Sequence, residues 1–586
     1  MPPFNCAKHQ HPERSLGRAE NGVRKIPICF PGSVGSDAAQ HHNVIKTLVL
    51  FLALSNTALG VASKPNIVFI LADDLGIGDI GCYGGDRCKI DTPNIDTLAA
   101  EGLRFTDAHV NASICSPTRR AIMTGRYNWR FGPTLNSGPW GFVGPRPGTE
   151  KSTLAKVLKR AGYHTGYVGK WHLGTTMTTR DGKRQGPGNT DFTKPLKYGP
   201  VQFGFNYSFI LPGSLDMFPY AYARNNQWLG EVTAQKGWSA FNRVGPAAKD
   251  FQDHEVLETF YKEAEGFIAK QNSDKPFFLF LALTAPHTPT SPGVKWRGRS
   301  KLGVYGDFVM ETDHAVERVM NALKANGWDK ETLVMFSSDH GAAPYAGNIL
   351  KATPAQLKKL EARGHYSSGP YRGYKFSIYE GGLRVPLVAR WPGVIPQGSS
   401  CNQLVGMNDL MATFAEISGA KLRAQEAPDS ISFAALLKNP RAKGIRKDLV
   451  MQSVAAFAIR DAHWKLCLCP GSGTHAISRN AAGNEPLAQE AWSAALASVK
   501  GPVTEPQLYQ APFVQLYNLS IDPAETTNLA AKHPERVRQM VALLQRQIEN
   551  GRSTQGLKLQ NDKRVQIINP RDRRLPQIVR ERLGVK

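Results

Sequence analysis

The sequence predicts an α/β protein with a large, mostly parallel sheet sandwiched by helices, followed by a smaller antiparallel sheet with a terminal helix. Short apolar runs alternate with segments of helical periodicity, as in doubly wound folds. The runs are apolar on both faces, which is typical of buried parallel strands. After about residue 440 the pattern changes to short strand-like runs and one long amphipathic segment.

Four apolar runs are predicted as strands of the large sheet, and each is followed by polar residues. The runs are Asn66 to Ala72, Thr165 to Val168, Pro276 to Leu283 and Thr332 to Ser337. The residues after them are, in the same order, Asp73 with Asp74, Lys170 with His172, His287, and Asp339 with His340. Because open α/β sheets bind ligands at the carboxyl ends of their strands, we expect these four endings to line one crevice.

Helices are predicted between these strands, where apolar residues recur at helical spacing. The candidates are Asp91 to Gly102, Ser152 to Ala161, His254 to Lys270 and Asp313 to Asn326. The stretch from Thr175 to Asn242 is rich in Gly, Asn and aromatic residues and is interpreted as long loops over the sheet. Loops of this kind commonly shape substrate pockets.

The C-terminal part is predicted to form a small antiparallel sheet with one helix. Its strand-like runs are Leu449 to Ile459, Trp464 to Leu468 and Val514 to Asn518, and the helix is Pro534 to Glu549. We therefore divide the chain into an N-terminal extension with a signal peptide (1–63), the α/β domain that carries the candidate site (64–440), a C-terminal subdomain (441–550) and a basic tail (551–586).

The N-terminus predicts export. A lysine at position 46 precedes the apolar run from Thr47 to Leu54 and small residues up to Ser63, which is the pattern of a secretory signal peptide. The preceding residues lack periodicity, which makes Val44 a candidate start site. A buried strand or an uncleaved membrane anchor is the alternative. We expect a periplasmic or secreted protein without stable membrane insertion, because no run of the mature region is long enough to span a bilayer.

The chain is strongly basic, with a formal net charge of +24 and an isoelectric point near 9.7. Lysine and arginine are dense between Gly551 and Lys586. A basic surface favours polyanions such as sulfated glycans, nucleic acid or anionic membranes, and a solvated charged tail is the simpler alternative. No zinc finger, RNA-binding signature or helix-turn-helix is apparent, so we expect no nucleic-acid partner.

The most informative motif is Cys115-Ser116-Pro117-Thr118-Arg119, with Thr124-Gly125-Arg126 just beyond it. Pro117 suits the first turn of a helix and Gly125 its end, so a short helix is predicted between them. Cys115 would then lie at the helix N-terminus, which favours an anion, and Arg119 could hold an oxyanion one turn further on. The alternative is a buried free cysteine before an ordinary basic helix.

A metal site is predicted at two of the strand endings. Asp73, Asp74, Asp339 and His340 offer mostly oxygen donors, which suit a hard cation such as Ca²⁺. The imidazole of His340 is a softer ligand. An Asp-Asp pair alone would be interpreted as a helix cap or a turn, but here it follows a buried strand and is matched by a second acidic strand ending.

Seven motifs between about Pro65 and Leu529 resemble those of the type I sulfatases, within the alkaline phosphatase superfamily, and occur in the family's order. They are NIVFILADDLG (66–76), the Cys115 signature, GYVGKWHLG (166–174), APH (285–287), SDHG (338–341), KFSIYEGGLRVP (375–386) and LYNLSIDPAETTNL (516–529). In this family the signature cysteine is oxidised to formylglycine, the nucleophile. The family often has serine where Thr118 stands, and threonine keeps the hydroxyl.

The resemblance implies a role for each matching residue. Asp73, Asp74, Asp339 and His340 would bind one Ca²⁺ together with formylglycine at position 115, and Arg119 would fix the formylglycine and its metal. One hydroxyl of hydrated formylglycine would attack sulfur, and the other would later expel sulfate, assisted by His172. Lys170 and Lys375 would contact the sulfate oxygens, and His287 would protonate the leaving alkoxide. A formylglycine-generating or sulfatase-maturating enzyme is the implied partner.

The predicted function is therefore hydrolysis of a sulfuric ester, either a sulfated carbohydrate or an aryl sulfate. Two alternatives stay open at this stage. A phosphomonoester or phosphonate hydrolase of the same superfamily would share the metal-binding strand endings. A non-catalytic polyanion-binding protein would use the basic surface and keep Cys115 unmodified. The basic character favours a sulfated polysaccharide among the substrates.

Overall fold

The computed structural model describes residues 64–132, 140–237, 242–346, 355–453, 456–469, 471–473, 514–565 and 567. The described residues belong to one compact unit, Lys64–Lys586. The predicted signal peptide and most of the basic tail lie outside the described residues. The predicted subdivision at residue 440 stays a prediction.

The large sheet has ten strands in the order β13-β2-β12-β11-β1-β10-β4-β5-β6-β7. Its five central strands, from β11 to β5, run parallel. The strands are β1 (Asn66–Asp73), β2 (Leu103–Phe105), β4 (His164–Lys170), β5 (Tyr207–Leu211), β6 (Ala223–Arg224), β7 (Gln227–Trp228), β10 (Phe277–Pro286), β11 (Thr332–Ser338), β12 (Leu387–Arg390) and β13 (Ser399–Cys401). The four predicted strands are neighbours in the sheet, so their carboxyl ends meet at one edge, as predicted.

The central strands are buried because they are apolar on both faces. Every residue of β1 and β10 is buried. Phe69 of β1 packs edge-on against Phe280 of β10, with ring centroids 5.0 Å apart, and against Phe414 of the helix layer. Such aromatic pairs contribute about 0.5 to 1.5 kcal/mol beyond the burial of their area. The sheet is therefore a rigid base for the residues at its edge.

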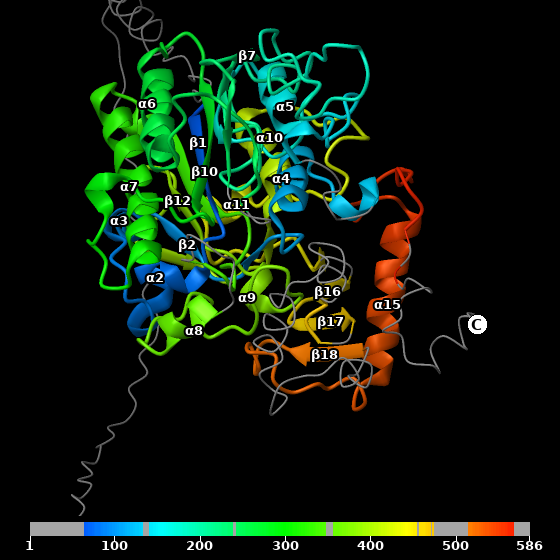
Figure 1. Cartoon of the computed structure of the whole chain (residues 1–586). Helices are drawn as coiled ribbons and strands as arrows, with labels where there is room; N and C mark the ends of the chain where they lie inside the picture. Colours follow the sequence, from blue (N-terminus) through cyan, green and yellow to red (C-terminus); the bar gives the residue numbers. More distant parts are fainter. Residues whose placement is uncertain are drawn as a thin grey trace, which may run out of the picture. The chain divides into compact units, whose positions relative to one another are not determined.

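Helices cover both faces of the sheet (Figure 1). One layer consists of α3 (Pro93–Ala100), α6 (Val256–Ala269) and α7 (Val304–Ala325), and the other of α4 (Cys115–Thr124), α5 (Leu154–Arg160) and α10 (Leu410–Ser418). The short helices are α2 (Gly81–Gly84), α8 (Ala355–Glu361), α9 (Glu380–Leu383) and α11 (Ala434–Lys438). This arrangement confirms the predicted fold class. Helix α7 begins at Val304 rather than Asp313, because Tyr305, Phe308 and Val309 extend its buried face.

The interpretation of residues 175–242 as loops was wrong in part. Within this stretch, β5 joins the parallel sheet beside β4, and β6 and β7 extend the sheet beyond it. A further short strand, β8 (Ala234–Lys236), pairs with β9 (Gly245–Ala247). Strand β5 has only five residues between Gly-rich and aromatic turns, so its apolar run is too short to stand out in the sequence.

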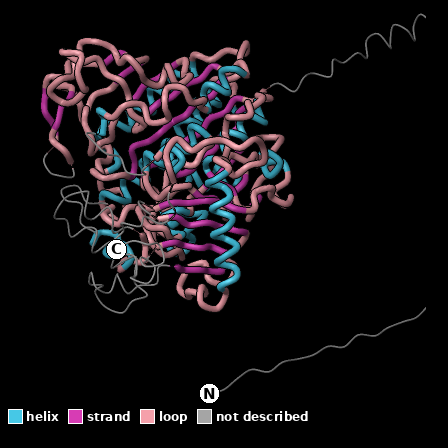
Figure 2. Tube along the Cα trace, turned by 90° about the vertical axis from the view of Figure 1, so that its right-hand side faces the viewer, coloured by secondary structure: helices cyan, strands magenta, loops and turns pink. Residues whose placement is uncertain are grey.

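The C-terminal residues form a separate four-stranded antiparallel sheet with a helix, as predicted. Its strands are β15 (Asp448–Gln452), β16 (Phe457–Asp461), β17 (Trp464–Leu468) and β18 (Val514–Asn518). Figure 2 shows α15 (Pro534–Glu549) lying across these strands, with Met540 and Leu544 buried. The predicted run from Leu449 to Ile459 is two strands of a hairpin, because the chain reverses between Gln452 and Phe457. None of the helices in the described residues is long and apolar enough to cross a membrane.

Candidate active site

Cys115 is the first residue of α4, as the motif predicts. The preceding residue, Ile114, has extended backbone angles, and the helix ends at Gly125, whose φ of 58° is left-handed. The Thr118 hydroxyl donates a hydrogen bond of 2.6 Å to the Ala112 carbonyl and so fixes the turn into the helix. Cys115 is buried, and as the first helical residue it lies at the end of α4 that carries free N–H groups. The helix therefore presents residue 115 at an anion-favouring position.

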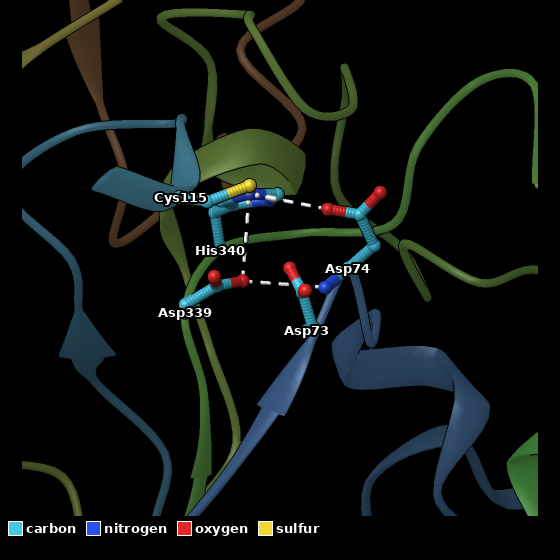
Figure 3. Close-up of side chains that lie close together, drawn as sticks. All are labelled: Asp73, Asp74, Cys115, Asp339 and His340. Carbon is cyan, nitrogen blue, oxygen red and sulfur yellow. Dashed lines mark hydrogen bonds and ion pairs between the residues drawn. The ribbon is translucent and has the colours of Figure 1, made fainter. Parts of the chain in front are cut away.

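Five side chains with metal-ligating atoms converge at the carboxyl edge of the sheet (Figure 3). Asp73 ends β1 and Asp74 follows it, while Asp339 and His340 follow β11. Together with Cys115 they are buried, and one ligand atom of each lies within 4.8 Å of the others. The structure thus brings together the whole predicted metal set, although the chain separates its members by up to 267 positions, from Asp73 to His340.

His340 is oriented by a backbone hydrogen bond. Its Nδ1–H donates to the Gly341 carbonyl over 2.9 Å. Nε2 then faces the centre of the cluster, 3.2 Å from Cys115 Sγ and 3.2 Å from Asp74 Oδ1. A histidine whose second nitrogen is fixed in this way is typical of metal sites.

Three buried cations surround the carboxylates. Lys170, at the end of β4, is paired with Asp73. Lys375 Nζ lies 2.7 and 2.9 Å from the two carboxylate oxygens of Asp74. Arg119 donates from Nε to Asp339 Oδ2 over 3.0 Å and from Nη1 to the Lys170 carbonyl over 3.0 Å. Three buried acids are therefore matched by three buried cations.

The electrostatics of the three carboxylates differ. Burial alone would raise the pKa of Asp73, but Lys170 and the other cations hold this pKa well below its usual range. Burial raises the pKa of Asp74 to about 8, with Lys375 opposing the shift and Asp73 adding to it. Burial and the charge of Asp73 raise the pKa of Asp339 to about 6. Where buried carboxylates lie close together and have raised pKa values, additional positive charge nearby favours their ionised form.

The two further histidines lie beside the cluster. His287 follows β10, with its Nε2 3.7 Å from Asp74 Oδ2, and its Nδ1–H donates to the Thr288 carbonyl. His172 follows β4 in a left-handed conformation with φ of 51°. Burial, together with the nearby lysines, lowers the pKa of both imidazoles well below the usual value, so both are neutral near pH 7. All the predicted site residues thus lie at or beside one cluster.

The donor set fits a hard divalent cation. Three carboxylates supply oxygen ligands, and Oδ1 of Asp73 is buried without a hydrogen-bond partner among the described residues. An unsatisfied buried carboxylate oxygen is costly unless a cation takes it up. A second group, Asp107, His109 and Glu380, also has ligand spacing. Its carboxylates are already paired with Arg384, Arg460 and Lys465, so it is an ion-pair network.

One residue near the site was missed by sequence reasoning. Asp216, buried in the turn after β5, has Oδ1 3.9 Å from His287 Nδ1, and its Oδ2 accepts a hydrogen bond of 3.0 Å from Arg243. The stretch that contains Asp216 carries no recognised motif. Only the fold brings Asp216 to His287, so the sequence held no signal for it.

Carboxylates and buried cations at the strand ends of an α/β sheet are suited to the hydrolysis of an anionic ester. Residues 65–420 match the family model described as Sulfatase. The chain belongs to the sulfatase family and is a sulfatase enzyme.

Relatives cover most of the chain. It is 30% identical over 530 residues to an N-acetylgalactosamine-6-O-sulfatase of Bacteroides thetaiotaomicron, covering 83% of this chain and 93% of that protein. It is 34% identical over 494 residues to arylsulfatase A of Homo sapiens, covering 82% and 86%. A structure solved in work on glycosaminoglycan metabolism by Bacteroides thetaiotaomicron has a TM-score of 0.68 at 29% identity, covering 83% of this chain and 99% of the other.

Proposed function

We propose that this sulfatase carries formylglycine at position 115, binds one Ca²⁺, and releases sulfate from a sulfated carbohydrate. The observation that carries the proposal is the cluster of Asp73, Asp74, Cys115, Asp339 and His340, whose ligand atoms lie within 4.8 Å of one another. Those five residues would hold the metal. When bound, Ca²⁺ supplies a fixed positive charge that polarises the sulfate group.

The charge balance of the site supports an anionic substrate. Three carboxylates are matched by Lys170, Lys375 and Arg119, so a divalent cation would leave an excess of positive charge. A sulfate ester carries one negative charge, and its transition state moves further charge to the leaving oxygen. Preorganised cations in a buried site oppose that charge where it develops. The two lysines are the groups proposed to contact the sulfate oxygens.

The neutral histidines are suited to proton transfer. We assign the protonation of the leaving alkoxide to His287, whose Nε2 takes up a proton when the anionic ester binds and passes it to the leaving oxygen, and the assistance of sulfate release to His172. Fixed at Nδ1 by the Thr288 carbonyl, His287 presents its other nitrogen to the site. General acid catalysis of this kind contributes about two to four orders of magnitude. Arg119 is assigned to hold residue 115 and Asp339 in place.

The names of the relatives support a sulfated carbohydrate as substrate. One relative is an N-acetylgalactosamine-6-O-sulfatase and another an arylsulfatase. The net charge of +24 favours an anionic polysaccharide over a small neutral aryl group. Sulfated amino sugars are therefore the first substrates to test. We further propose that the chain is exported through its N-terminal segment and matured by a formylglycine-generating or sulfatase-maturating enzyme.

The decisive experiment combines mass and activity. The chain is produced together with a maturating enzyme, and intact-mass analysis of the peptide around residue 115 should show an aldehyde in place of the thiol. Sulfate release is then measured on sulfated amino sugars, an aryl sulfate and the matching phosphate monoesters. We expect Cys115→Ala to abolish release, while Cys88→Ala, which removes a half-buried free thiol elsewhere, keeps it.

Two results would overturn the proposal. Sulfate release that persists in Cys115→Ala would exclude residue 115 as the nucleophile. A preference for phosphate monoesters over sulfates would favour the related hydrolase class.

A further inference from the structure

A second charged cleft lies away from the candidate active site. It has a volume of about 760 Å³ and is bordered by the end of α4, the exposed side of α5, and two segments from later in the chain, 423–428 and 559–560. Helix α4 connects the two places, since Cys115 is its first residue and Thr124 its last. At the rise of an α-helix, these two residues are about 14 Å apart along its axis.

The lining of this cleft is predominantly cationic. Six basic side chains face two acidic ones: Arg126, Lys151, Lys156, Lys159, Arg160 and Arg423 against Glu150 and Glu426. Glu426 is already held by Arg160 at 2.7 Å and by the Ser152 hydroxyl at 2.6 Å. In the part of the chain that the structure describes, Lys156, Lys159 and Arg423 form no ion pair with a carboxylate. We call this lining the basic cleft.

Two arginines beside Phe131 are buried and incompletely paired: Arg126, which lines the basic cleft, and Arg120, which does not. The guanidinium groups of Arg120 and Arg126 lie 4.8 and 5.0 Å from the ring centre of Phe131, which also lines the cleft. Arg126 pairs with Asp562 at 3.0 Å. The Nε atoms of both arginines lack a hydrogen-bond acceptor among the described residues. Burial lowers the pKa of both groups.

Cations that face each other across a concave surface repel one another, and the field in the cleft attracts anions. An unpaired buried guanidinium donor also costs free energy that an anionic acceptor would recover. The cleft is far larger than one sulfate ion, and its cations come from three separate segments. Its ligand should therefore carry several anionic groups at intervals.

We propose that the basic cleft is a second binding site for a sulfated polysaccharide, separate from the candidate active site. It would hold a sulfated stretch of the same chain whose terminal ester is hydrolysed, and in this respect the inference rests on the proposed function. Ammonium and guanidinium groups bind sulfate oxygens through charge-assisted hydrogen bonds. The cleft would thus raise the affinity for long substrates without taking part in bond cleavage.

The test is a charge reversal at two exposed positions of the cleft. The full chain with Lys159→Glu and Arg423→Glu is compared with the wild type and with a control, Lys324→Glu with Lys330→Glu, which makes the same charge change at exposed positions elsewhere. Heparin is the probe, and its binding is measured by titration at low and at physiological salt. We expect the cleft variant to bind at least about tenfold more weakly, a difference that shrinks with salt, and the control to bind nearly like the wild type.

Other outcomes separate the alternatives. Equal heparin affinity of the cleft variant and the control would overturn the proposal. The proposal would also be overturned, in favour of the other ligand, if the cleft variant lost more affinity for duplex DNA or for phosphatidylserine vesicles than for heparin. Hydrolysis of a small aryl sulfate should be the same in all three proteins. If the wild type lacks that hydrolysis but the cleft variant still loses heparin binding, the proposed function fails while the binding site stands.

Discussion

Several residues of the candidate site hold a backbone conformation that side chains usually avoid. Asp74 and His172 have φ values of 65° and 51°, and Phe376, next to Lys375, has 75°. Non-glycine residues in the left-handed region cost about 1 to 3 kcal/mol and persist only where the surroundings impose them. The buried strand β1 ends directly before Asp74, and β4 ends two residues before His172, so the strain is supported by the rigid sheet. The Asp74 side chain points into the cluster (Figure 3).

A buried acid far from the site provides a test of the electrostatics of single residues. Glu311 of α7 is buried, and its Oε2 accepts a hydrogen bond of 2.8 Å from the Gly293 amide. Burial raises its pKa from 4.5 to about 7. The folded state therefore holds the proton more tightly than the unfolded state, and stability falls as the pH rises from about 4.5 to about 7.

We expect Glu311→Gln to stabilise the protein at pH 8 by about 3 kcal/mol and to change little at pH 4.5, since each pKa unit corresponds to about 1.4 kcal/mol. The amide keeps an oxygen for Gly293 and has no charge to bury. Thermal unfolding midpoints at both pH values measure the effect. Glu317→Gln, at an exposed position of the same helix, is the control and should shift neither midpoint appreciably. An equal rise of the thermal midpoint at both pH values would contradict the raised pKa of Glu311.

At the scale of elements, the small C-terminal sheet holds the loop that carries Lys375. The Ile378 amide donates to the Ser472 carbonyl over 2.9 Å, and the Glu380 amide donates to Glu525 Oε2 over 2.6 Å. Lys465 of β17 lies 2.9 Å from a carboxylate oxygen of each of the two glutamates. All three charged groups are fully buried. The residues of the small sheet and its neighbouring loops therefore position the loop that carries Lys375.

Removing the shared cation should loosen this loop. We expect Lys465→Met to destabilise the fold by about 3 to 5 kcal/mol, because it leaves the buried Glu525 carboxylate without its cation and removes one of the partners of Glu380. We also expect it to lower the rate of sulfate release at temperatures where the variant is still folded by circular dichroism. Adding Glu525→Gln should restore part of the stability, since it removes the carboxylate that has lost its cation.

The control for this change is Arg536→Met, which removes a partly exposed cation of α15 that pairs with Asp461 at 3.2 Å. Partly exposed pairs of this kind contribute at most about 1 kcal/mol. If Lys465→Met behaves like this control in both stability and rate, the C-terminal sheet does not position the loop.

At the scale of the whole molecule, the sequence predicts the sheet and the metal cluster better than the network around them. Strands β1 and β11 are apolar runs with acidic residues at or just after their ends, a pattern that can be recognised in each run by itself. Because the two strands are parallel neighbours, their acidic ends meet at one edge of the sheet. Lys375 has no such signal and was found through the resemblance. Glu380, Lys465 and Glu525 were missed, because each partner comes from a different segment, 85 and 145 positions away from Glu380.

The whole fold should be stabilised by the metal that its strand endings are proposed to hold. A ligand that binds only the folded state adds about 2.7 kcal/mol at one hundred times its dissociation constant. We therefore expect CaCl₂ to raise the thermal midpoint above its value in EDTA. The increase should be larger at pH 7.5 than at pH 5, because protons compete for Asp339 and Asp74, whose pKa values are raised to about 6 and about 8.

Two variants decide whether this increase belongs to the candidate site. Asp339→Asn removes one proposed ligand and should abolish most of the calcium-dependent increase. Asp107→Asn alters the second acidic group, whose carboxylates are occupied by arginine and lysine, and should leave the increase intact even if the midpoint itself falls. An equal calcium response in all three proteins would place the ion elsewhere. A calcium-dependent rise of the midpoint that is lost only in Asp339→Asn would show that the ion binds at the carboxyl edge of the sheet and stabilises the fold from there.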